Sequence, residues 1–498
     1  MLINFVLFAL VFSSCSPKNK IEIQDLDFKI PEEWSFPIHS SSMPDEDSIG
    51  SLLPNDKRRD WWSYFNNPNL DTFLAGVKNQ SPDLRTLIQN EKISLNNARI
   101  IGGNIFPSVS ASINSSESVQ NLSAFGFADS FFQPADGDTT NQATSANDVI
   151  ISFENKTYGL GINYQWEIDV LGRLLNERRA AKTDYEAVRH DLSYLGFSIL
   201  VRSAILYFQG VEAAAQVALS EESYESLIEI RDLVKERYEK GLRSSLDYRL
   251  SETSVSTAIL ENESRKNQLS FINRQLQIIL GKYPSGHFIK EDRLPDYLPP
   301  VPKIIPAVIL TNRPDINSLL LKVEANGYRI AQAKRNLFPG LFLSGSVGTS
   351  TKKYEDILDE NFGVWNLGLS VSAPLFNGNR LRSNLKIQEA LFEKSKEDLK
   401  KGLLQAFSDV EQLLYIDQSL VRQIKAIKFA EEQSKDAYSL SKERYDKGVT
   451  TLESVLNSQR QYNLIRSQNL VLNRQSIENR LNLFLALGGS HNLNSDKK

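Results

Sequence analysis

The sequence predicts a membrane-associated protein that is mostly α-helical and consists of two homologous halves, each combining β-strands with long helices. Three observations lead to this prediction. The stretch 158–241 recurs as 365–448, at a constant offset of 207 residues. Four runs, each about ten residues long, alternate apolar residues with small or polar ones, as strands with one apolar face do. Long proline-free stretches, 174–283 and 375–498, carry apolar residues at spacings of three and four, which indicates helices.

The repeat is visible in individual residues as well as in the pattern. Each copy ends its long helical run with a Glu-Arg-Tyr triplet, at 236–238 and at 443–445. A Lys-Gly pair follows each triplet, at 240–241 and at 447–448. A repeat of this length indicates one body built from two related halves, where chain length alone would suggest several ordinary domains.

Composition excludes several classes of protein. The net charge is −4 and the pI is about 5.8, so no basic surface for nucleic acid is expected. No apolar run of 18 residues follows the N-terminal segment, which argues against a transmembrane helix, although membrane-spanning strands give a much weaker signal. The four histidines are scattered, and no phosphate-binding loop or nucleophile motif is present. We therefore expect no catalytic residue, no metal ligand and no cofactor.

The only cysteine, Cys15, closes an N-terminal apolar segment. The apolar run 5–12 is followed by two serines and then by this cysteine, which is typical of a secretory signal and resembles a bacterial lipobox. We expect residues 1–15 to be a lipoprotein signal and Cys15 to carry a covalent lipid. The alternative is an ordinary signal peptide with an incidental cysteine. The polar residues 16–60 are expected to tether the lipid to the folded body.

Short and long helices are expected in both halves. Ser81 is the expected cap of a short helix that starts at Pro82, and a Phe-Pro pair ends this helix in each half. A glycine after each Glu-Arg-Tyr triplet marks the end of the long helix and the start of a turn. The short helices are predicted over 82–105 and 314–337, the long ones over 174–238 and 381–445, and the returning ones over 244–280 and onward from 448 to about 487.

The four predicted strands have the length and pattern of strands that cross a bilayer. Apolar side chains alternate with small or polar ones, so each strand has one apolar face. About ten residues suffice to cross the hydrocarbon as a tilted strand, and the aromatic residues Tyr158 and Trp166 would suit the membrane interface. The strands are expected at about 107–117, 157–167, 340–349 and 364–374.

The elements form two repeats joined by a proline-rich linker. The offset between the halves falls from 232 to 207 residues across the first strand pair, so the loop there is 25 residues longer than its counterpart. The expected parts are a signal at 1–15, a tether at 16–60, a first repeat at 61–280, a linker at 281–313, a second repeat at 314–489 and a polar tail at 490–498.

The strands decide between two architectures. Four strands cannot close a barrel, and an open sheet edge in hydrocarbon leaves backbone groups unsatisfied, so the strands must be shared among copies of the chain. An eight-stranded barrel has an interior filled by side chains, and more strands are needed before an aqueous bore opens. A ring of long helices would continue that bore, which predicts an oligomeric conduit. The rival is a periplasmic coiled-coil scaffold or adhesin without a pore, which would leave the strands unexplained.

The ordered motifs resemble those of the TolC-like outer-membrane efflux protein family, in particular its lipidated branch that serves resistance-nodulation-division pumps. The resemblance implies a homotrimer in the outer membrane. In it, a twelve-stranded β-barrel with four strands per chain would be continued by a long α-helical barrel in the periplasm. The resemblance covers residues 57–489 and rests on the segments 81–84, 106–108, 167–173, 313–315, 338–339 and 373–376, and on Arg380.

The same resemblance implies a function. The trimer would be a passive exit duct for small molecules, opened at its periplasmic tip when it docks to an adaptor protein and an inner-membrane pump. An alternative is the outer-membrane duct of a one-step protein secretion system. Because the inner-membrane partner would select the cargo, the sequence of this chain identifies neither the substrate nor the pump.

The resemblance places the functional residues at the two helical tips. It implies that Tyr445 pairs with Asp247 to hold the periplasmic end closed, while Thr450 stands where the family often has a reinforcing arginine. Ser454 and Asn457 occupy positions that are usually acidic. Glu453 either supplies the acidic group of the constriction, where like charges would raise its pKa, or lies on a solvated helix face. The residues expected to meet the adaptor are Arg237, Tyr238, Gly241, Arg444 and Gly448.

Overall fold

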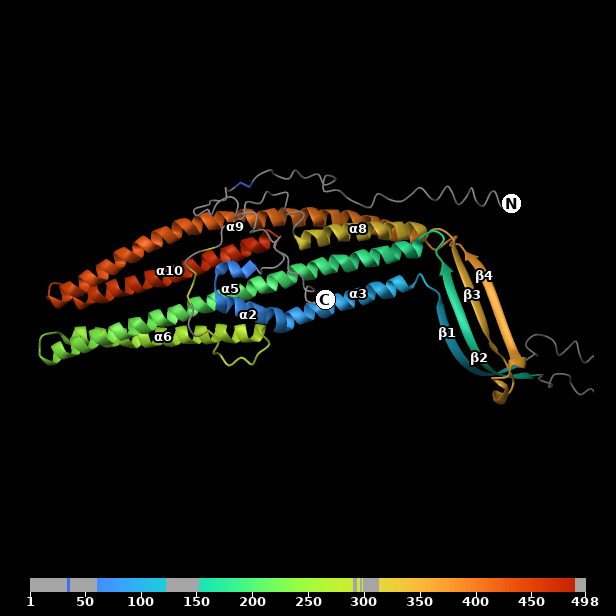
Figure 1. The fold of residues 1–498 in the computed structure, drawn as a ribbon, viewed down its shortest axis with the longest axis horizontal. Helices are drawn as coiled ribbons and strands as arrows, with labels where there is room; N and C mark the ends of the chain where they lie inside the picture. The colour runs from blue at the N-terminus through green and yellow to red at the C-terminus, as the bar shows by residue number, and fades with distance from the viewer. Residues whose placement is uncertain are drawn as a thin grey trace, which may run out of the picture. The chain divides into compact units, whose positions relative to one another are not determined.

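Helices dominate the computed structural model of the chain, and a four-stranded sheet accompanies them in the described residues (Figure 1). The expected fold class, a mostly helical chain with a strand region and two repeats, is confirmed. Cys15 with the signal, nearly all of the tether, the long loop between the first two strands, most of the linker and the polar tail lie outside the described residues. The structure describes residues 34–35, 61–121, 152–289, 293–295, 298 and 313–488.

Helices at equivalent places in the two halves have equal lengths. The short helices have 22 residues, the long ones 67 and the returning ones 35. Each of these helices ends within two residues of its predicted end, because proline, glycine and capping residues mark the ends locally. The pairs are α3 (Pro82–Gly103) with α8 (Pro314–Arg335), α5 (Arg173–Glu239) with α9 (Arg380–Asp446), and α6 (Ser245–Ile279) with α10 (Leu452–Ala486).

Among the described α-helices, α2 (Pro68–Gln80) was not predicted, and a short 3₁₀ helix, η3 (Trp61–Phe65), precedes it. The Asn67 side chain caps α2 by accepting hydrogen bonds from the backbone N–H groups of Asn69 and Leu70, at 3.0 and 2.9 Å. The large apolar residues of α2 recur at spacings of one, three and four and are all buried: Leu70, Phe73, Leu74 and Val77.

The chain forms two compact units, and four helices continue from one into the other. The first unit comprises 97–182 and 325–392 and contains the sheet. The second comprises the described parts of 20–96, 183–324 and 393–498 and is helical. The helices that belong to both are α3, α5, α8 and α9.

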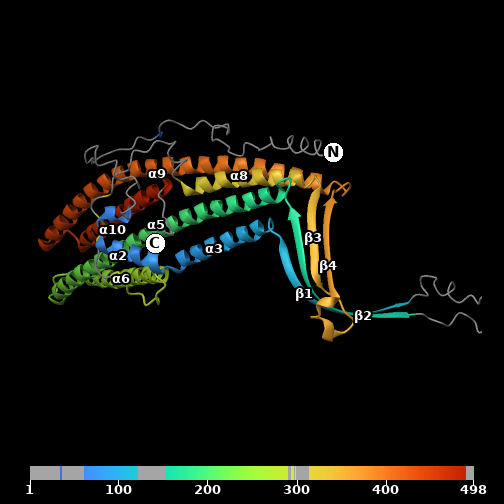
Figure 2. The same ribbon diagram turned by 45° about the vertical axis from the view of Figure 1, so that its right-hand side comes forward.

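The sheet of the first unit is antiparallel, with the strands in chain order. The first two strands are longer than expected, because β2 pairs with β1 over its residues 152–165. Only residues 161–168 of β2 pair with β3. A two-stranded ribbon therefore continues past β3 and β4, as Figure 2 shows. The strands are β1 (Ser108–Asn121), β2 (Ser152–Ile168), β3 (Gly340–Thr349) and β4 (Gly363–Ser372).

The register gathers the apolar residues on one face of the sheet. Residues directly opposite each other in neighbouring strands point to the same side. Ile162 lies opposite both Ala111 and Val347, and Val347 lies opposite Trp365. Side chains on this face are largely exposed in the single chain. The exposed fractions are 66% for Val109, 75% for Ile113, 79% for Trp365, 69% for Leu367 and 70% for Val371.

The other face of the sheet carries mostly serine, glycine and asparagine. Examples are Ser112 opposite Gly161, and Ser344 opposite Gly368. Trp166, which lies on the apolar face opposite Leu343, donates its indole N–H to the backbone oxygen of Ile105 at 3.0 Å. That bond joins the end of β2 to the chain between α3 and β1.

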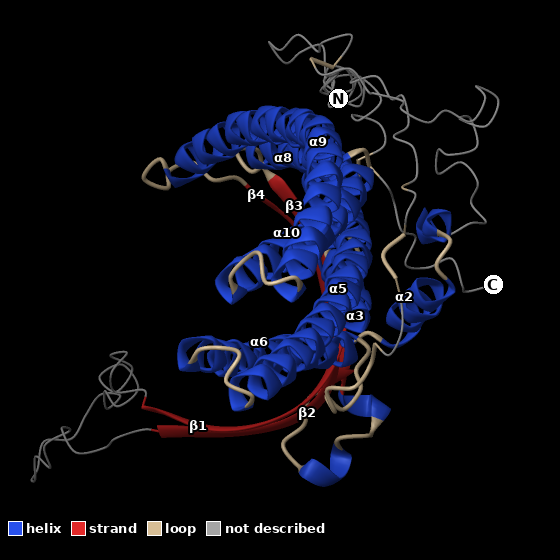
Figure 3. Ribbon diagram, turned by 90° about the vertical axis from the view of Figure 1, so that its left-hand side faces the viewer, coloured by secondary structure: helices blue, strands red, loops and turns tan. Residues whose placement is uncertain are grey.

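The second unit consists mainly of two helical hairpins that lie side by side (Figure 3). The first hairpin is α5 with α6, the second is α9 with α10, and α5 lies against α10. A large apolar core gathers α2, the middle of α5 and the later parts of α6 and α10. Its aromatic contacts include Phe73 stacked on Tyr207 at 5.5 Å and Phe65 beside Phe208 at 5.7 Å between ring centroids.

Among the described helices, α5 is the one that is long and apolar enough to cross a membrane. Its most apolar window is 61% buried within the protein. The buried residues of this part of α5, such as Phe197 and Phe208, belong to the apolar core of the second unit. Helix α5 therefore has the character of a core helix.

A glycine at 348 is required for the pairing of β2 with β3. A Cβ atom at Gly348 would lie 2.1 Å from the backbone oxygen of Leu160, far inside contact distance. We expect Gly348→Ala to destabilise the sheet by about 1–3 kcal/mol, because the backbone must shift. The measurement is thermal unfolding of the purified protein in detergent, followed by circular dichroism in the strand region.

Gly161, directly opposite Gly348, provides the matched control. A Cβ atom there would meet only the Ser112 hydroxyl, at 3.7 Å, which is an ordinary contact. Gly161→Ala should therefore melt close to the wild type. Equal melting temperatures for the two variants would show that the close approach at Gly348 does not limit the sheet.

Candidate functional site

The two hairpins end in turns of the same construction. Gly241 and Gly448 follow the long helices with φ angles of +71° and +75°, in the left-handed region that favours glycine. In the first turn, Leu242 N–H donates to the Arg237 carbonyl at 2.8 Å and Gly241 N–H donates to the Tyr238 carbonyl at 2.9 Å. The second turn has the same two bonds, at 2.9 and 3.0 Å. This pattern is a Schellman cap, and it satisfies the last carbonyls of each long helix.

A side-chain cap starts each returning helix. The Ser244 hydroxyl accepts a hydrogen bond from Asp247 N–H at 3.1 Å, and the Thr451 hydroxyl accepts one from Ser454 N–H at 3.4 Å. Asp247 and Ser454 are repeat equivalents in the first turns of α6 and α10. The Asp247 carboxylate is half-buried and lies at the N-terminus of α6, where the helix dipole favours a negative charge.

Tyr445, at the end of α9, is the centre of the tip. Its side chain is only 3% exposed and packs in an apolar cluster that joins both hairpins. Its hydroxyl is buried and has no hydrogen-bond partner in the described structure. This tip cluster consists of Ile230, Val234, Tyr445, Leu452, Val455 and Leu456.

Two arginines of the first hairpin lie over the Tyr445 ring. The guanidinium carbon of Arg243 is 4.5 Å from the ring centroid, and that of Arg237 is 5.6 Å away. Arg243 Nη2 also donates to the Tyr445 backbone oxygen at 3.4 Å, and Arg237 Nη2 lies 3.5 Å from a carboxylate oxygen of Asp446. Burial raises the pKa of the Tyr445 phenol, the charge of Arg243 opposes this rise, and the nearby charge of Asp247 adds to it.

The structure brings together some of the predicted tip residues and not others. Asp247 lies close enough to affect the charge state of Tyr445, but the Tyr445 hydroxyl makes no hydrogen bond to it in the single chain. Tyr238 is 40% exposed and stacks on Tyr248, with ring centroids 5.5 Å apart and an interplanar angle of 3°. The remaining predicted gate residues, Glu453, Ser454 and Asn457, and the remaining predicted tip residues, Gly241, Arg444 and Gly448, are exposed.

Sequence analysis did not identify Arg243 as a tip residue. The signal was present, because Arg243 is the repeat equivalent of Thr450, the position at which an arginine was expected and found missing. Only the packing of the two hairpins places its guanidinium against a residue 202 positions away.

Hydrogen bonds between polar side chains join the hairpins between the tip and the large core. Gln216 and Ser467 make two hydrogen bonds, at 2.9 and 3.1 Å, and Asn463 donates to the Ser223 hydroxyl at 2.8 Å. We name these contacts the polar seam. It comprises the pairs Gln216–Ser467, Ser223–Asn463, Ser226–Gln459 and Glu222–Arg466, the last bidentate at 2.8 Å.

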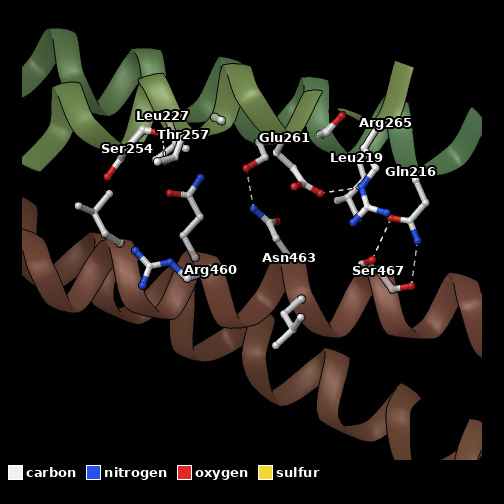
Figure 4. Close-up of a pocket in the computed structure, with 16 residues that line it drawn as sticks. Gln216, Leu219, Leu227, Ser254, Thr257, Glu261, Arg265, Arg460, Asn463 and Ser467 are labelled. Carbon is white, nitrogen blue, oxygen red and sulfur yellow. Dashed lines mark hydrogen bonds and ion pairs between the residues drawn. The ribbon is translucent and has the colours of Figure 1, made fainter. Parts of the chain in front are cut away.

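A cavity of about 390 Å³ lies along the polar seam, between α5, α6 and α10 (Figure 4). Its lining mixes leucine side chains with polar ones, among them Ser254, Thr257 and the ion pair Glu261–Arg265 at 2.6 Å. Figure 4 shows the seam bonds of Asn463 and Ser467 reaching across from α10. At this level hydrogen bonds join the two hairpins beside the cavity, and the buried apolar clusters lie toward the tip and toward the large core.

Glu167 and Asp169, two carboxylates near each other, serve the junction between β2 and α5. Arg173 donates to Glu167 through Nε at 2.9 Å and Nη2 at 2.5 Å, and this bond raises the pKa of Arg173. The Asp169 carboxylate accepts from Leu175 N–H at 2.6 Å in the first turn of α5. Among the described residues, no three His, Cys, Asp or Glu side chains gather as metal ligands would.

Gly448 should be essential to the second turn. A residue with a Cβ atom in the left-handed conformation costs about 1–2 kcal/mol, so we expect Gly448→Ala to loosen the last turn of α9. The measurement is amide hydrogen exchange of the segment 440–455, which should become faster. Lys447→Ala, one residue earlier at an exposed position, is the control and should leave the exchange unchanged; a similar acceleration in both variants would contradict the requirement for glycine.

Comparison with known proteins gives concordant results. The family model described as "Outer membrane efflux protein" matches residues 75–282 and 305–489. The chain is 25% identical over 434 residues to the toluene efflux pump outer membrane protein TtgF of Pseudomonas putida, covering 87% of this chain and 86% of that one. It is 27% identical over 440 residues to the pyoverdine export outer membrane protein OpmQ of Pseudomonas aeruginosa, covering 86% and 87%. The open-state structure of the Neisseria gonorrhoeae MtrE outer membrane channel superposes with a TM-score of 0.74 at 20% identity, covering 93% and 96%.

Proposed function

This chain belongs to the outer membrane efflux protein family, and from that premise we propose that three copies enclose one duct through the outer membrane and into the periplasm. As a member of the family, the chain is an outer-membrane component of an efflux system. The duct is passive: it offers a path, and the energy for transport comes from an inner-membrane pump that reaches it through a periplasmic adaptor.

The proposal that several copies of the chain share one barrel rests on the sheet. β1 and β4 are the outer strands of the sheet in the described residues, so each leaves one edge for pairing with another copy. The exposed apolar face would meet lipid, and the face of serine, glycine and asparagine would line water. Hydrocarbon requires closure of the sheet, and eight strands would leave an interior filled by side chains. Three copies supply twelve strands.

The mass of the detergent-extracted particle tests this assembly. We expect about three times the chain mass of 56.3 kDa, because three sheets are needed for an open bore. Light scattering with the detergent contribution subtracted gives the mass. Negative-stain images should show three-fold symmetry and a shaft of roughly 100 Å, the length of a 67-residue helix. A monomeric or dimeric particle would rule out the twelve-stranded barrel.

Small molecules are the proposed cargo. The names of two relatives refer to toluene for TtgF and to pyoverdine for OpmQ, and neither name refers to a protein as cargo. Relatives of one family thus serve different solutes, and we assign the choice of cargo to the pump. A duct for protein secretion receives no support from these names.

The lipid anchor and the adaptor contacts complete the proposal. We propose a covalent lipid on Cys15, which would anchor the N-terminus of the chain in the outer membrane. The two turns are proposed to meet the adaptor, because their backbones are alike and largely exposed. The contact residues would be Arg237, Tyr238, Gly241, Arg444 and Gly448.

The closed gate is proposed to lie at the same tip. Tyr445 and Asp247 are the proposed lock, in which the buried unpaired hydroxyl and the nearby carboxylate become partners in the assembled trimer. Glu453, Ser454 and Asn457 are exposed on the first turns of α10 and would line the constriction. Of these three, Glu453 alone carries a charge, so any acidic ring at this level depends on it.

The polar seam suggests how the gate opens. Exchanging a hydrogen bond between side chains for one to water changes the free energy by only about 0.5–1.5 kcal/mol, so hairpins joined by such bonds can shift at modest cost. The small tip cluster is the apolar part that must separate. We therefore propose that the second hairpin moves against the first along the seam, and that the large core stays fixed.

Cross-linking the seam tests both the motion and the function. We first compare a strain that lacks the gene with its parent, to find solutes that accumulate in the cells of the deletion strain. The deletion strain is then complemented with the variant S223C/N463C. A short bifunctional thiol reagent should restore the accumulation seen in the deletion strain, because the bridged hairpins cannot shift. Secreted proteins should be unaffected.

A cross-link within the second hairpin is the matched control. The hydroxyl groups of Ser441 and Ser458 lie 2.5 Å apart on α9 and α10, so S441C/S458C bridges two helices that move together. Efflux should survive this bridge. Unimpaired efflux with the S223C/N463C bridge would contradict movement along the seam, and a deletion strain that loses protein secretion while handling solutes normally would contradict the function itself.

A further inference from the structure

Two arginines at the tip, Arg243 and Arg237, contact Tyr445 but take no part in the proposed lock of Tyr445 and Asp247. The inference from this contact rests on the proposed gate. We propose that Arg243 is a positioning residue of the gate. Its guanidinium holds the end of α9 against the turn of the first hairpin, so that the second hairpin cannot move until this contact is broken. We name the contact of Arg243 and Arg237 with Tyr445 the arginine clamp.

The position of Arg243 is fixed by the turn that carries it. It lies between Gly241, which closes the Schellman cap of α5, and Ser244, which caps α6. A cation at this place has few alternative positions, because the backbone on either side is held by hydrogen bonds. The side chain is half-buried and extends across to the second hairpin.

Arg243 makes two different contacts with the same residue. Its guanidinium carbon lies 4.5 Å from the centroid of the Tyr445 ring, within the range of a cation–π interaction. Its Nη2 lies 3.4 Å from the Tyr445 backbone oxygen, one of the last carbonyls of α9. A positive charge is favoured there by the helix dipole, so Arg243 also caps the helix of the other hairpin.

Arg237 supports the clamp from the end of α5. Its guanidinium lies 5.6 Å from the same ring and 3.5 Å from the carboxylate of Asp446, the last residue of α9. The Tyr445 ring thus has two cations of the first hairpin beside it, and the apolar tip cluster packs against it.

The clamp has no counterpart at the repeat-equivalent positions. At the repeat-equivalent positions, Tyr238 takes the place of Tyr445 and Thr450 the place of Arg243. Threonine has no cation to place over a ring, and Tyr238 is instead 40% exposed and stacked on Tyr248 of its own hairpin. The first hairpin therefore supplies the cations of the contact, and the turn of the second hairpin has no cation at Thr450 to place over Tyr238.

The ring, and not the hydroxyl, is what the clamp recognises. The Tyr445 hydroxyl is buried and makes no hydrogen bond in the described structure. Tyr445→Phe should therefore leave the clamp intact, whereas Tyr445→Leu should remove it. This difference separates the clamp from a lock that depends on the hydroxyl and Asp247.

Single-channel recording of the purified protein in planar bilayers provides the test. We expect Arg243→Gln to raise the mean conductance about five- to tenfold, the change in a closed–open equilibrium that a partly buried cation–π contact can supply. Arg243→Lys should lie between Arg243→Gln and the wild type, because lysine keeps the charge but loses the planar stacking. Tyr445→Leu should match Arg243→Gln, and the double variant should conduct no more than either single one, since both remove one contact.

Lys442 offers the control. It is exposed near the end of α9 and is not among the residues proposed to form the gate or to meet the adaptor. Lys442→Gln, which also removes one positive charge, should conduct like the wild type. Particle mass and thermal unfolding are measured for every variant, and Arg243→Lys, which preserves charge and size, keeps the test valid if Arg243→Gln fails to assemble.

The possible failures are distinguishable. Wild-type conductance in Arg243→Gln together with a raised conductance in Asp247→Ala would reject the clamp and leave the tip gate standing. A rise in Tyr445→Phe as large as that in Tyr445→Leu would assign the closure to the hydroxyl. Unchanged conductance in all of Arg243→Gln, Tyr445→Leu and Asp247→Ala would reject the proposed gate itself.

Discussion

Backbone hydrogen bonding in a medium without water is the constraint on which the proposed assembly depends. In hydrocarbon every N–H and C=O group needs a partner within the protein. The sheet has an exposed apolar face, which suits lipid, but its outer strands β1 and β4 each keep an unpaired edge in the described residues. Pairing those edges between copies satisfies both conditions. Four helices then continue from the sheet unit, two short and two long, so the number of strands also sets the number of helices that follow the barrel.

Local signals were enough to predict most of the fold. Proline at a helix start, glycine after a helix end and the strict alternation of the strands act within a few residues, and the observed helices end within two residues of their predictions. Helix α2 was missed although Asn67 and Pro68 mark its start. The aligned positions 300–312 of the second half carry prolines, so the repeat gave no support for a helix there.

Contacts between the halves could not be predicted, because periodicity identifies a helix face without identifying its partner. The polar seam is an example. Gln216 and Ser223 on α5, like Asn463 and Ser467 on α10, have the character of solvated positions in the sequence, and only the packing of α5 against α10 pairs them. Arg243 is a second example, since its partner Tyr445 lies 202 positions away in the other repeat.

Divergence between the repeats gives the tip its asymmetry. The two turns share their backbone geometry, down to the hydrogen bonds and the φ angles of Gly241 and Gly448. Two identical turns would each place a cation over the tyrosine of the other hairpin. Exchanging arginine for threonine at one pair of equivalent positions leaves Arg243 over the Tyr445 ring at the end of α9, and no cation of Thr450 over the Tyr238 ring at the end of α5. In the proposed gate the second hairpin is the one that moves. The polar seam is the surface along which it would shift against the first hairpin.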